Sequence, residues 1–157
     1  MELYRVCKRR NAGLSGTGSK AAGGRWNSSG NAVVYCSGNR SLAVLEYLAH
    51  FADLIIPDDL VLLSIYAPSG GPIKEIKLKM LPANWKTFPA PAKLKELGDD
   101  WLRRNDSLLM KVPSVIIDNE YNYLINPSHR NMIKVKIISK EKFSVDERLI
   151  FKDEKKK

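Results

Sequence analysis

The sequence has little of what several kinds of site require. Its 157 residues include two cysteines and two histidines. Cys7 and Cys36 are too few for a disulfide framework, and Cys36 ends an apolar segment, where a free thiol packs as a small hydrophobe. No cluster of Cys, His and Asp at metal-ligand spacing surrounds His50 or His129. The sequence therefore predicts structural cysteines and no metal site.

Long apolar runs are also missing. No segment approaches the roughly 20 apolar residues that span a bilayer, and the N-terminal segment MELYRVCKRR has no apolar core of the signal-peptide type. We therefore expect a cytoplasmic protein. Hydrophobic residues make up 44% of the chain and charged residues 27%, as in ordinary globular proteins. This length predicts one domain over residues 1–151 and a charged tail over residues 152–157.

The two common phosphate-binding fingerprints are absent as well. The sequence has no G-x-G-x-x-G between a strand and a helix, and no G-x-x-x-x-G-K-[ST]. Residues 11–31 are nevertheless rich in glycine, which allows close backbone approach to a ligand. Arg25 stands there between a glycine pair and Trp26. Because a guanidinium binds phosphate oxygens bidentately, this shaped loop is a candidate phosphate site.

An apolar segment with one carboxylate follows this loop. Residues 31–36 are typical of a strand that carries Tyr35, and Ser41 is a plausible N-cap for a helix that runs to about Phe51. Apolar residues surround that helix, so we expect it to be buried. Glu46 interrupts it, and a buried carboxylate costs free energy unless it is paired or used.

The remaining pattern predicts short strands without regular alternation of strands and helices. Pro113 breaks an apolar run, which would leave Ser114 displayed at a sheet edge. Trp85 and Phe88 are expected to anchor the proline-rich loop 81–91. This pattern favours an α+β domain with two small sheets enclosing a cleft. The other predicted strands are 3–8, 60–67, 76–80, 108–112, 115–117, 121–126, 134–138 and 148–151, and a second helix is predicted over 92–104.

Several motifs in chain order resemble the RES-domain family of bacterial toxins: LSGTGSKAAGGRWN, AVVYCS, SLAVLEYLAH, VPSVI, NYLINPSH and DERL. The resemblance runs from about Tyr4 to Leu149. It implies a fold like the ADP-ribosyltransferase catalytic domain and an enzyme that consumes NAD+ without a metal. It also implies a helix-turn-helix, Xre-like antitoxin that covers the active site, so that nucleic acid is reached only through this partner. A homodimer is expected, because family members often pair.

The resemblance assigns roles to individual residues. Arg25 would hold the pyrophosphate, and Tyr35 would stack on the nicotinamide or its ribose. Glu46 would stabilise the cationic transition state, and Ser114 would bond a ribose, a phosphate or the carboxamide. Asn126 either bonds the substrate or caps the turn that follows it.

The expected reaction is cleavage of the nicotinamide–ribose bond of NAD+. The acceptor is water, inorganic phosphate or a protein side chain; we favour net NAD+ degradation, with protein mono-ADP-ribosylation as the alternative. The net charge of +9 also fits a nucleic-acid-binding or RNA-cleaving toxin. The chain lacks an aromatic–basic ladder and a histidine pair for acid–base cleavage, which weighs against that class. A catalytically silent interaction protein is the third possibility.

Overall fold

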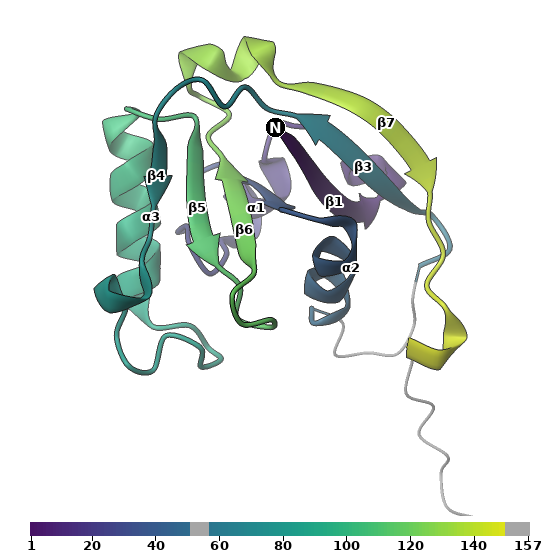
Figure 1. The fold of residues 1–157 in the computed structure, drawn as a ribbon, viewed down its shortest axis with the longest axis horizontal. Helices are drawn as coiled ribbons and strands as arrows, with labels where there is room; N and C mark the ends of the chain where they lie inside the picture. Colours follow the sequence, from purple (N-terminus) through teal and green to yellow (C-terminus); the bar gives the residue numbers. More distant parts are fainter. Residues whose placement is uncertain (51–56, 150–157) are drawn as a thin grey trace, which may run out of the picture.

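A computed structural model describes residues 1–50 and 57–149 of the chain. Figure 1 shows the strands and helices of this part. Among the described residues, none of the helices has the length and hydropathy of a membrane span. In chain order the elements are β1 (Glu2–Lys8), η1 (Arg9–Asn11), α1 (Thr17–Ala22), β2 (Val34–Ser37), α2 (Arg40–Leu48), β3 (Leu60–Tyr66), β4 (Ile73–Glu75), η2 (Leu78–Met80), α3 (Ala92–Arg104), β5 (Leu109–Pro113), β6 (Tyr121–Ile125), η3 (Arg130–Lys134), β7 (Lys136–Lys142) and η4 (Glu147–Leu149).

The strands form one mixed sheet in the order β4-β5-β6-β2-β1-β3-β7. Strands β4 and β5 are parallel, and the other neighbours are antiparallel. A single register pair, Tyr4 with Ser37, joins β1 to β2. The sheet therefore has two arms, β4-β5-β6-β2 and β1-β3-β7, which diverge in Figure 1 with α2 between them. The predicted α+β class is confirmed, and the two small sheets of the prediction are the arms of one sheet.

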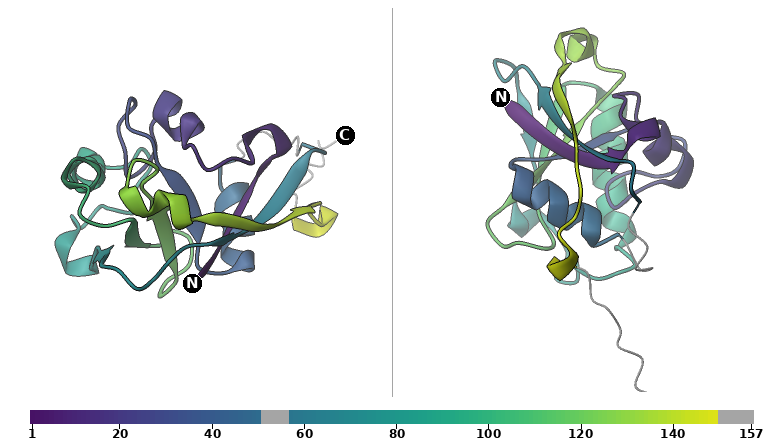
Figure 2. Two further views of the ribbon diagram at one scale, coloured as in Figure 1. Left: turned by 90° about the horizontal axis from the view of Figure 1, so that it is seen from above. Right: turned by 90° about the vertical axis from the view of Figure 1, so that its right-hand side faces the viewer.

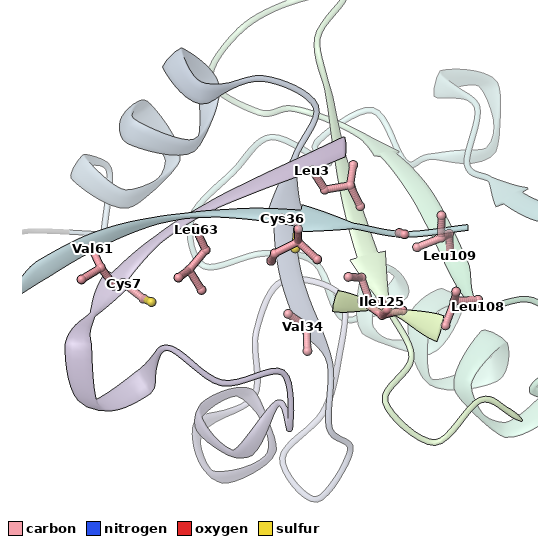
Figure 3. Close-up of a cluster of buried hydrophobic side chains, with 12 residues drawn as sticks. Leu3, Cys7, Val34, Cys36, Val61, Leu63, Leu108, Leu109 and Ile125 are labelled. Atoms are coloured by element: carbon pink, nitrogen blue, oxygen red, sulfur yellow. The ribbon is translucent and has the colours of Figure 1, made fainter. Parts of the chain in front are cut away.

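Alternation along the strands sorts the side chains onto two faces. One face carries a core cluster that spans both arms of the sheet, and Figure 3 shows its packing. Cys7 and Cys36 belong to it, and both thiols are free and buried, as predicted. Burial raises the pKa of the Cys36 thiol to about 12, so it stays protonated and packs as an apolar group.

The opposite face is covered by two helices. On the β4-β5-β6-β2 arm, Leu94 and Trp101 of α3 pack against Met110 and Leu124. On the other arm, Ala43 of α2 packs in a cluster with residues of β1 and β3. Figure 2 shows α2 and α3 well apart along the sheet. The candidate site described below lies on this face between the two helix-covered clusters.

Helix α2 differs from its prediction at its start and in its burial. Its N-cap is Asn39 and not Ser41: the Asn39 side chain accepts a hydrogen bond of 2.8 Å from the N–H of Leu42. Leu42 and Ala43 are its buried residues, and the other apolar side chains are half-buried. The expectation of a buried helix is wrong, because α2 lies on one face of the sheet. The predicted end at Phe51 lies outside the described residues.

The segment from Ile76 to Phe88 also departs from its prediction. Residues 76–80 form no strand, since β4 ends at Glu75 and the chain turns through η2. Ile76 is buried, whereas Leu78 and Met80 are exposed, so their alternation does not reflect a sheet face. Trp85 anchors the following loop as expected, but the Phe88 side chain is 94% exposed and anchors nothing within the fold.

The C-terminal third combines accurate and inaccurate predictions. Helix α3 matches the predicted range 92–104, and β6 matches the predicted strand within one residue. Residues 115–117 form a loop, because two of their N–H groups bond a side chain instead of a neighbouring strand. The last strand, β7, begins two residues later than predicted and extends to Lys142. Residues 148–149 belong to the 3-10 turn η4, and residues 150–151 lie outside the described part.

Candidate active site

The structure brings Glu46 and Ser114 into direct contact. Ser114 Oγ donates a hydrogen bond of 2.8 Å to Glu46 Oε1. A second donor, Asn122 Nδ2, bonds the same oxygen. Glu46 lies on α2, Ser114 directly follows β5, and Asn122 lies on β6. Three elements that are distant in sequence therefore meet at one carboxylate.

Ser114 is buried rather than displayed at an edge, with 2% of its surface exposed. Its Oγ accepts hydrogen bonds from the N–H groups of Ile116 at 3.1 Å and Ile117 at 3.2 Å. A hydroxyl has one donor and two acceptor positions, and these three contacts use all of them. The Ser114 hydroxyl is thus committed to the protein, where it fixes the Glu46 carboxylate.

Asn122 is the residue that the sequence reasoning missed. Its Oδ1 accepts a hydrogen bond of 2.7 Å from Ser37 Oγ, and the two residues are opposite each other in the β2–β6 ladder. The available signal was alternation, since Asn122 stands two positions before Leu124 and shares its core-facing side of β6. A polar residue on such a face needs a partner, and Glu46 and Ser37 supply two.

Arg25 is held by main-chain carbonyls. Its guanidinium donates to the carbonyl oxygens of Trp85 at 2.7 Å and Thr87 at 3.2 Å. Burial lowers the pKa of Arg25 from its ordinary value, while the negative charge of Glu46 acts in the opposite direction. Arg25 and Glu46 are therefore close enough for their charges to interact, across the face between α2 and α3.

Tyr35 supports the loop that carries Arg25, residues 23–31, which we call the arginine loop. Its hydroxyl donates to Asn27 Oδ1 at 2.7 Å and accepts from the Trp26 N–H at 3.1 Å. Burial raises the pKa of this phenol, so it remains a neutral donor. A Cβ at Gly24 would lie 2.5 Å from the Tyr35 hydroxyl oxygen, which explains a glycine next to Arg25.

The arginine loop is also fastened to α3. A Cβ at Gly98 would lie 1.7 Å from the carbonyl oxygen of Trp26, so the helix and the loop touch through their backbones. One carboxylate oxygen of Asp99 accepts from the Ser28 N–H at 3.0 Å and from Asn31 Nδ2 at 2.8 Å. Burial acts to raise the pKa of Asp99, but these hydrogen bonds outweigh it and the pKa is lowered.

Asn126 is not brought to this cluster. It lies four residues beyond Asn122, at the other end of β6, a separation of about 13 Å in an extended strand. Its Nδ2 donates to Asn105 Oδ1 at 2.9 Å, and its Oδ1 accepts from the Ser128 N–H at 3.0 Å. Of the two alternatives, the structure favours the turn-capping one.

A cavity of about 590 Å³ borders the cluster. Ser114 and Trp85 line it, together with Ile76, Glu120 and Tyr121. This volume lies within the range of small-molecule sites, but neither Arg25 nor Glu46 lines the cavity. Within residues 1–50 and 57–149, no three His, Cys, Asp or Glu side chains gather where they would hold a metal ion.

Comparison with protein families decides the relationship. The model of the RES domain matches residues 2–146. The chain belongs to the RES domain family. The predicted family is therefore confirmed, and the match covers every residue of the cluster around Glu46.

Individual RES-domain relatives are toxins. "Toxin Res" of Yersinia enterocolitica is 36% identical over 133 residues, which are 83% of this chain and 87% of that protein. The "Prs ADP-ribosylating toxin" of a Sphingobium species is 33% identical over 150 residues, or 88% of each chain. The structure also matches a chain of the MbcT-MbcA toxin–antitoxin complex of M. tuberculosis, with a TM-score of 0.74 and 13% identity over 91% of this chain and 84% of that one. At that identity the structural match shows a shared fold.

Proposed function

We propose that this RES-domain protein is a toxin that binds NAD+ and cleaves its nicotinamide–ribose bond. The observation that carries the proposal is that a fixed carboxylate, Glu46, and a half-buried guanidinium, Arg25, lie on one face of the sheet. NAD+ offers a matching pair of features, an anionic pyrophosphate and a ribose that becomes cationic during cleavage.

The reaction needs charge stabilisation more than it needs a nucleophile on the protein. The C1′–N bond breaks, and nicotinamide leaves with the electron pair as a neutral molecule. The ribose C1′ then resembles an oxocarbenium ion, as in glycoside cleavage. A water oxygen bonds to C1′ and releases a proton to solvent, which gives ADP-ribose. Glu46 would stabilise the cation, an effect on the order of 3 kcal/mol or more.

Arg25 is suited to the pyrophosphate. A guanidinium carries five N–H donors, and the Trp85 and Thr87 carbonyls take two of them. The remaining donors can bond phosphate oxygens without release of the first two. Partial burial strengthens such a charged contact.

Tyr35 and Ser114 would serve the site in other ways than the sequence alone indicates. Both hydroxyls are already bonded within the protein. We therefore propose that the Tyr35 ring forms a wall for the substrate and that Ser114 fixes Glu46. Asn126 would stay outside the substrate site as a turn cap.

Incubation of the purified protein with NAD+, with free nicotinamide followed by chromatography, tests the proposal. We expect release by the unchanged protein and at least about a 100-fold loss in Arg25→Ala and Glu46→Gln. Two matched controls on the exposed surface of α3, Arg103→Ala and Glu96→Gln, should retain activity. No release by the folded unchanged protein, or full activity in both site variants, would contradict the proposal.

The acceptor distinguishes the favoured reaction from its alternative. One relative is named an ADP-ribosylating toxin, so protein mono-ADP-ribosylation is the second candidate. Mass spectrometry of the reaction separates them: free ADP-ribose indicates hydrolysis, ADP-ribose 1″-phosphate indicates phosphorolysis, and a protein carrying ADP-ribose indicates transfer. RNA cleavage without nicotinamide release would instead support the nucleic-acid class.

We further propose that an antitoxin of the helix-turn-helix, Xre-like type covers this site. The structural neighbour is part of a toxin–antitoxin complex, and Phe88 is 94% exposed on the loop whose carbonyls hold Arg25. A net charge of +9 favours an acidic partner segment. Phe88→Asp should weaken inhibition by the antitoxin without changing nicotinamide release.

A further inference from the structure

We propose that Ser37 and Asn122 are positioning residues that hold one oxygen of Glu46 and leave the other to the substrate. This inference rests on the proposed cleavage of NAD+ and names two residues that the resemblance does not assign. Neither side chain needs to touch the substrate. Their role is to fix the direction of a carboxylate that does.

The hydrogen bonds to Glu46 are strongly asymmetric. Ser114 Oγ and Asn122 Nδ2 both donate to Oε1. In the described part of the chain, Oε2 accepts no hydrogen bond, and it is not among the buried atoms without a partner. Oε2 is therefore open to solvent. Two donors on one oxygen also fix the plane of the carboxylate, so that Oε2 has a defined direction.

The charge of Glu46 determines the orientation of the Asn122 amide. A carboxylate oxygen only accepts hydrogen bonds, so the amide must present its NH2 group to Glu46. Its carbonyl oxygen then faces Ser37, whose hydroxyl donates at 2.7 Å. A flipped amide would set two acceptor oxygens against each other at Glu46. The hydrogen bond from Ser37 thus stabilises the amide orientation in which Asn122 donates to Glu46.

The scaffold beneath this chain of contacts is buried and paired on both sides. Ser37 is 3% exposed and pairs with Asn122 in the β2–β6 ladder. It also pairs with Tyr4, at the single register pair that joins the two arms of the sheet. A serine here has no route to solvent for its hydroxyl, so a partner is required. Through Asn122 and Ser37, the position of Glu46 is fixed relative to the middle of the sheet.

Steady-state kinetics of nicotinamide release test the inference. Positioning acts on the transition state, so Asn122→Ala should lower kcat by up to about 100-fold with little change in the KM for NAD+. Ser37→Ala should lower kcat by about 5-fold, which corresponds to one neutral hydrogen bond. Ser37→Thr keeps a hydroxyl and should restore most of the loss. Ser64→Ala is the matched control, because Ser64 is a buried serine on the other arm that bonds Arg40.

A double-mutant cycle separates positioning from a general structural effect. Because Ser37 acts through Asn122, Ser37→Ala should change kcat little once Asn122 is alanine, and Asn122→Ala should change it little in Glu46→Gln. Independent, multiplying effects would overturn the inference, as would a normal kcat in folded Asn122→Ala. Asn122→Leu keeps a similar volume and loses the donor, so it serves if the alanine variant does not fold.

The failure of this inference is distinguishable from failure of the proposed function. If the unchanged protein releases no nicotinamide, the proposed function falls and the positioning role falls with it. If the unchanged protein is active and the Ser37 and Asn122 variants match it, only the positioning role is rejected.

Discussion

Arg25 and Glu46, the two charged residues of the proposed site, are held in opposite ways. The guanidinium of Arg25 is bonded by main-chain carbonyls of the loop that contains Trp85 and Thr87. The carboxylate of Glu46 is bonded by side chains, Ser114 and Asn122, from two strands of the sheet. We name Arg25, its carbonyl partners and the loop that carries it the arginine side. We name Glu46 and the strand ends that hold its side-chain partners the glutamate side.

The difference decides which substitutions each side tolerates. Main-chain partners persist whatever side chains the loop carries, so the arginine side depends on the path of the backbone. The path of the segment that carries Arg25 depends in turn on Gly24 and Gly98, where a Cβ has no room against Tyr35 and Trp26. The glutamate side depends on the identity of three polar side chains, Ser114, Asn122 and Ser37. The arginine side should therefore be broken by added volume and the glutamate side by lost hydrogen bonds.

The largest expected effect on the arginine side comes from Gly98→Ala. In a helix interior this change alone would stabilise by about 1 kcal/mol. Here the new Cβ would lie 1.7 Å from the carbonyl oxygen of Trp26, so the helix and the loop must separate. We expect a net destabilisation of at least about 2 kcal/mol, measured by urea denaturation, and weaker NAD+ binding.

Gly38→Ala is the matched control on the glutamate side. Its Cβ would meet the carbonyl oxygen of Tyr121 at 3.3 Å, which needs only a small adjustment. Its effect on the free energy of unfolding should stay within about 1 kcal/mol. Equal destabilisation by the two variants would contradict the proposed dependence of the arginine side on backbone contact.

A smaller effect is expected from Tyr35→Phe. The change removes the hydroxyl that joins Asn27 to the Trp26 N–H and leaves both without this partner. An unsatisfied buried polar group costs about 1–3 kcal/mol. We expect destabilisation in that range, together with a higher KM for NAD+ because the loop that carries Arg25 loosens. A raised KM with unchanged thermal stability would instead indicate direct contact between the hydroxyl and the substrate.

Elements with strong local patterns were predictable from the sequence. Helix α3 carries Leu94 and Trp101 at helical spacing, and its predicted range agrees with the structure. The alternation at Ile76, Leu78 and Met80 misled, because it depends on a neighbouring strand to pair with, and β4 stops pairing with β5 after Glu75. A pattern describes which side chains alternate, whereas pairing is decided by distant strands.

The site shows the same limit. Arg25 and Glu46 were recognisable because a charge in a glycine loop or on an apolar helix stands out locally. Asn122 was not, since its importance arises only when β6 lies beside β2 and under α2. Asn126 stands out locally through its NP setting, yet its Oδ1 accepts from the Ser128 N–H of the following turn and its Nδ2 donates to Asn105. Tertiary partners, rather than residue type, separate the two asparagines.

The smallest effect on the arginine side should be visible only in acid. The hydrogen bonds from Ser28 and Asn31 lower the pKa of Asp99 below 3.8 in the folded chain, despite the opposing effect of burial. A lowered folded pKa means that the carboxylate stabilises the fold above pH of about 3.8 and that this stabilisation disappears as the pH falls through the folded pKa. Asp99→Asn lacks an ionisable group there. We therefore expect the unchanged protein to have the higher urea midpoint at pH 7 and the difference to shrink by pH 3. A difference that is constant with pH would show that the Asp99 contacts act through shape and not through charge.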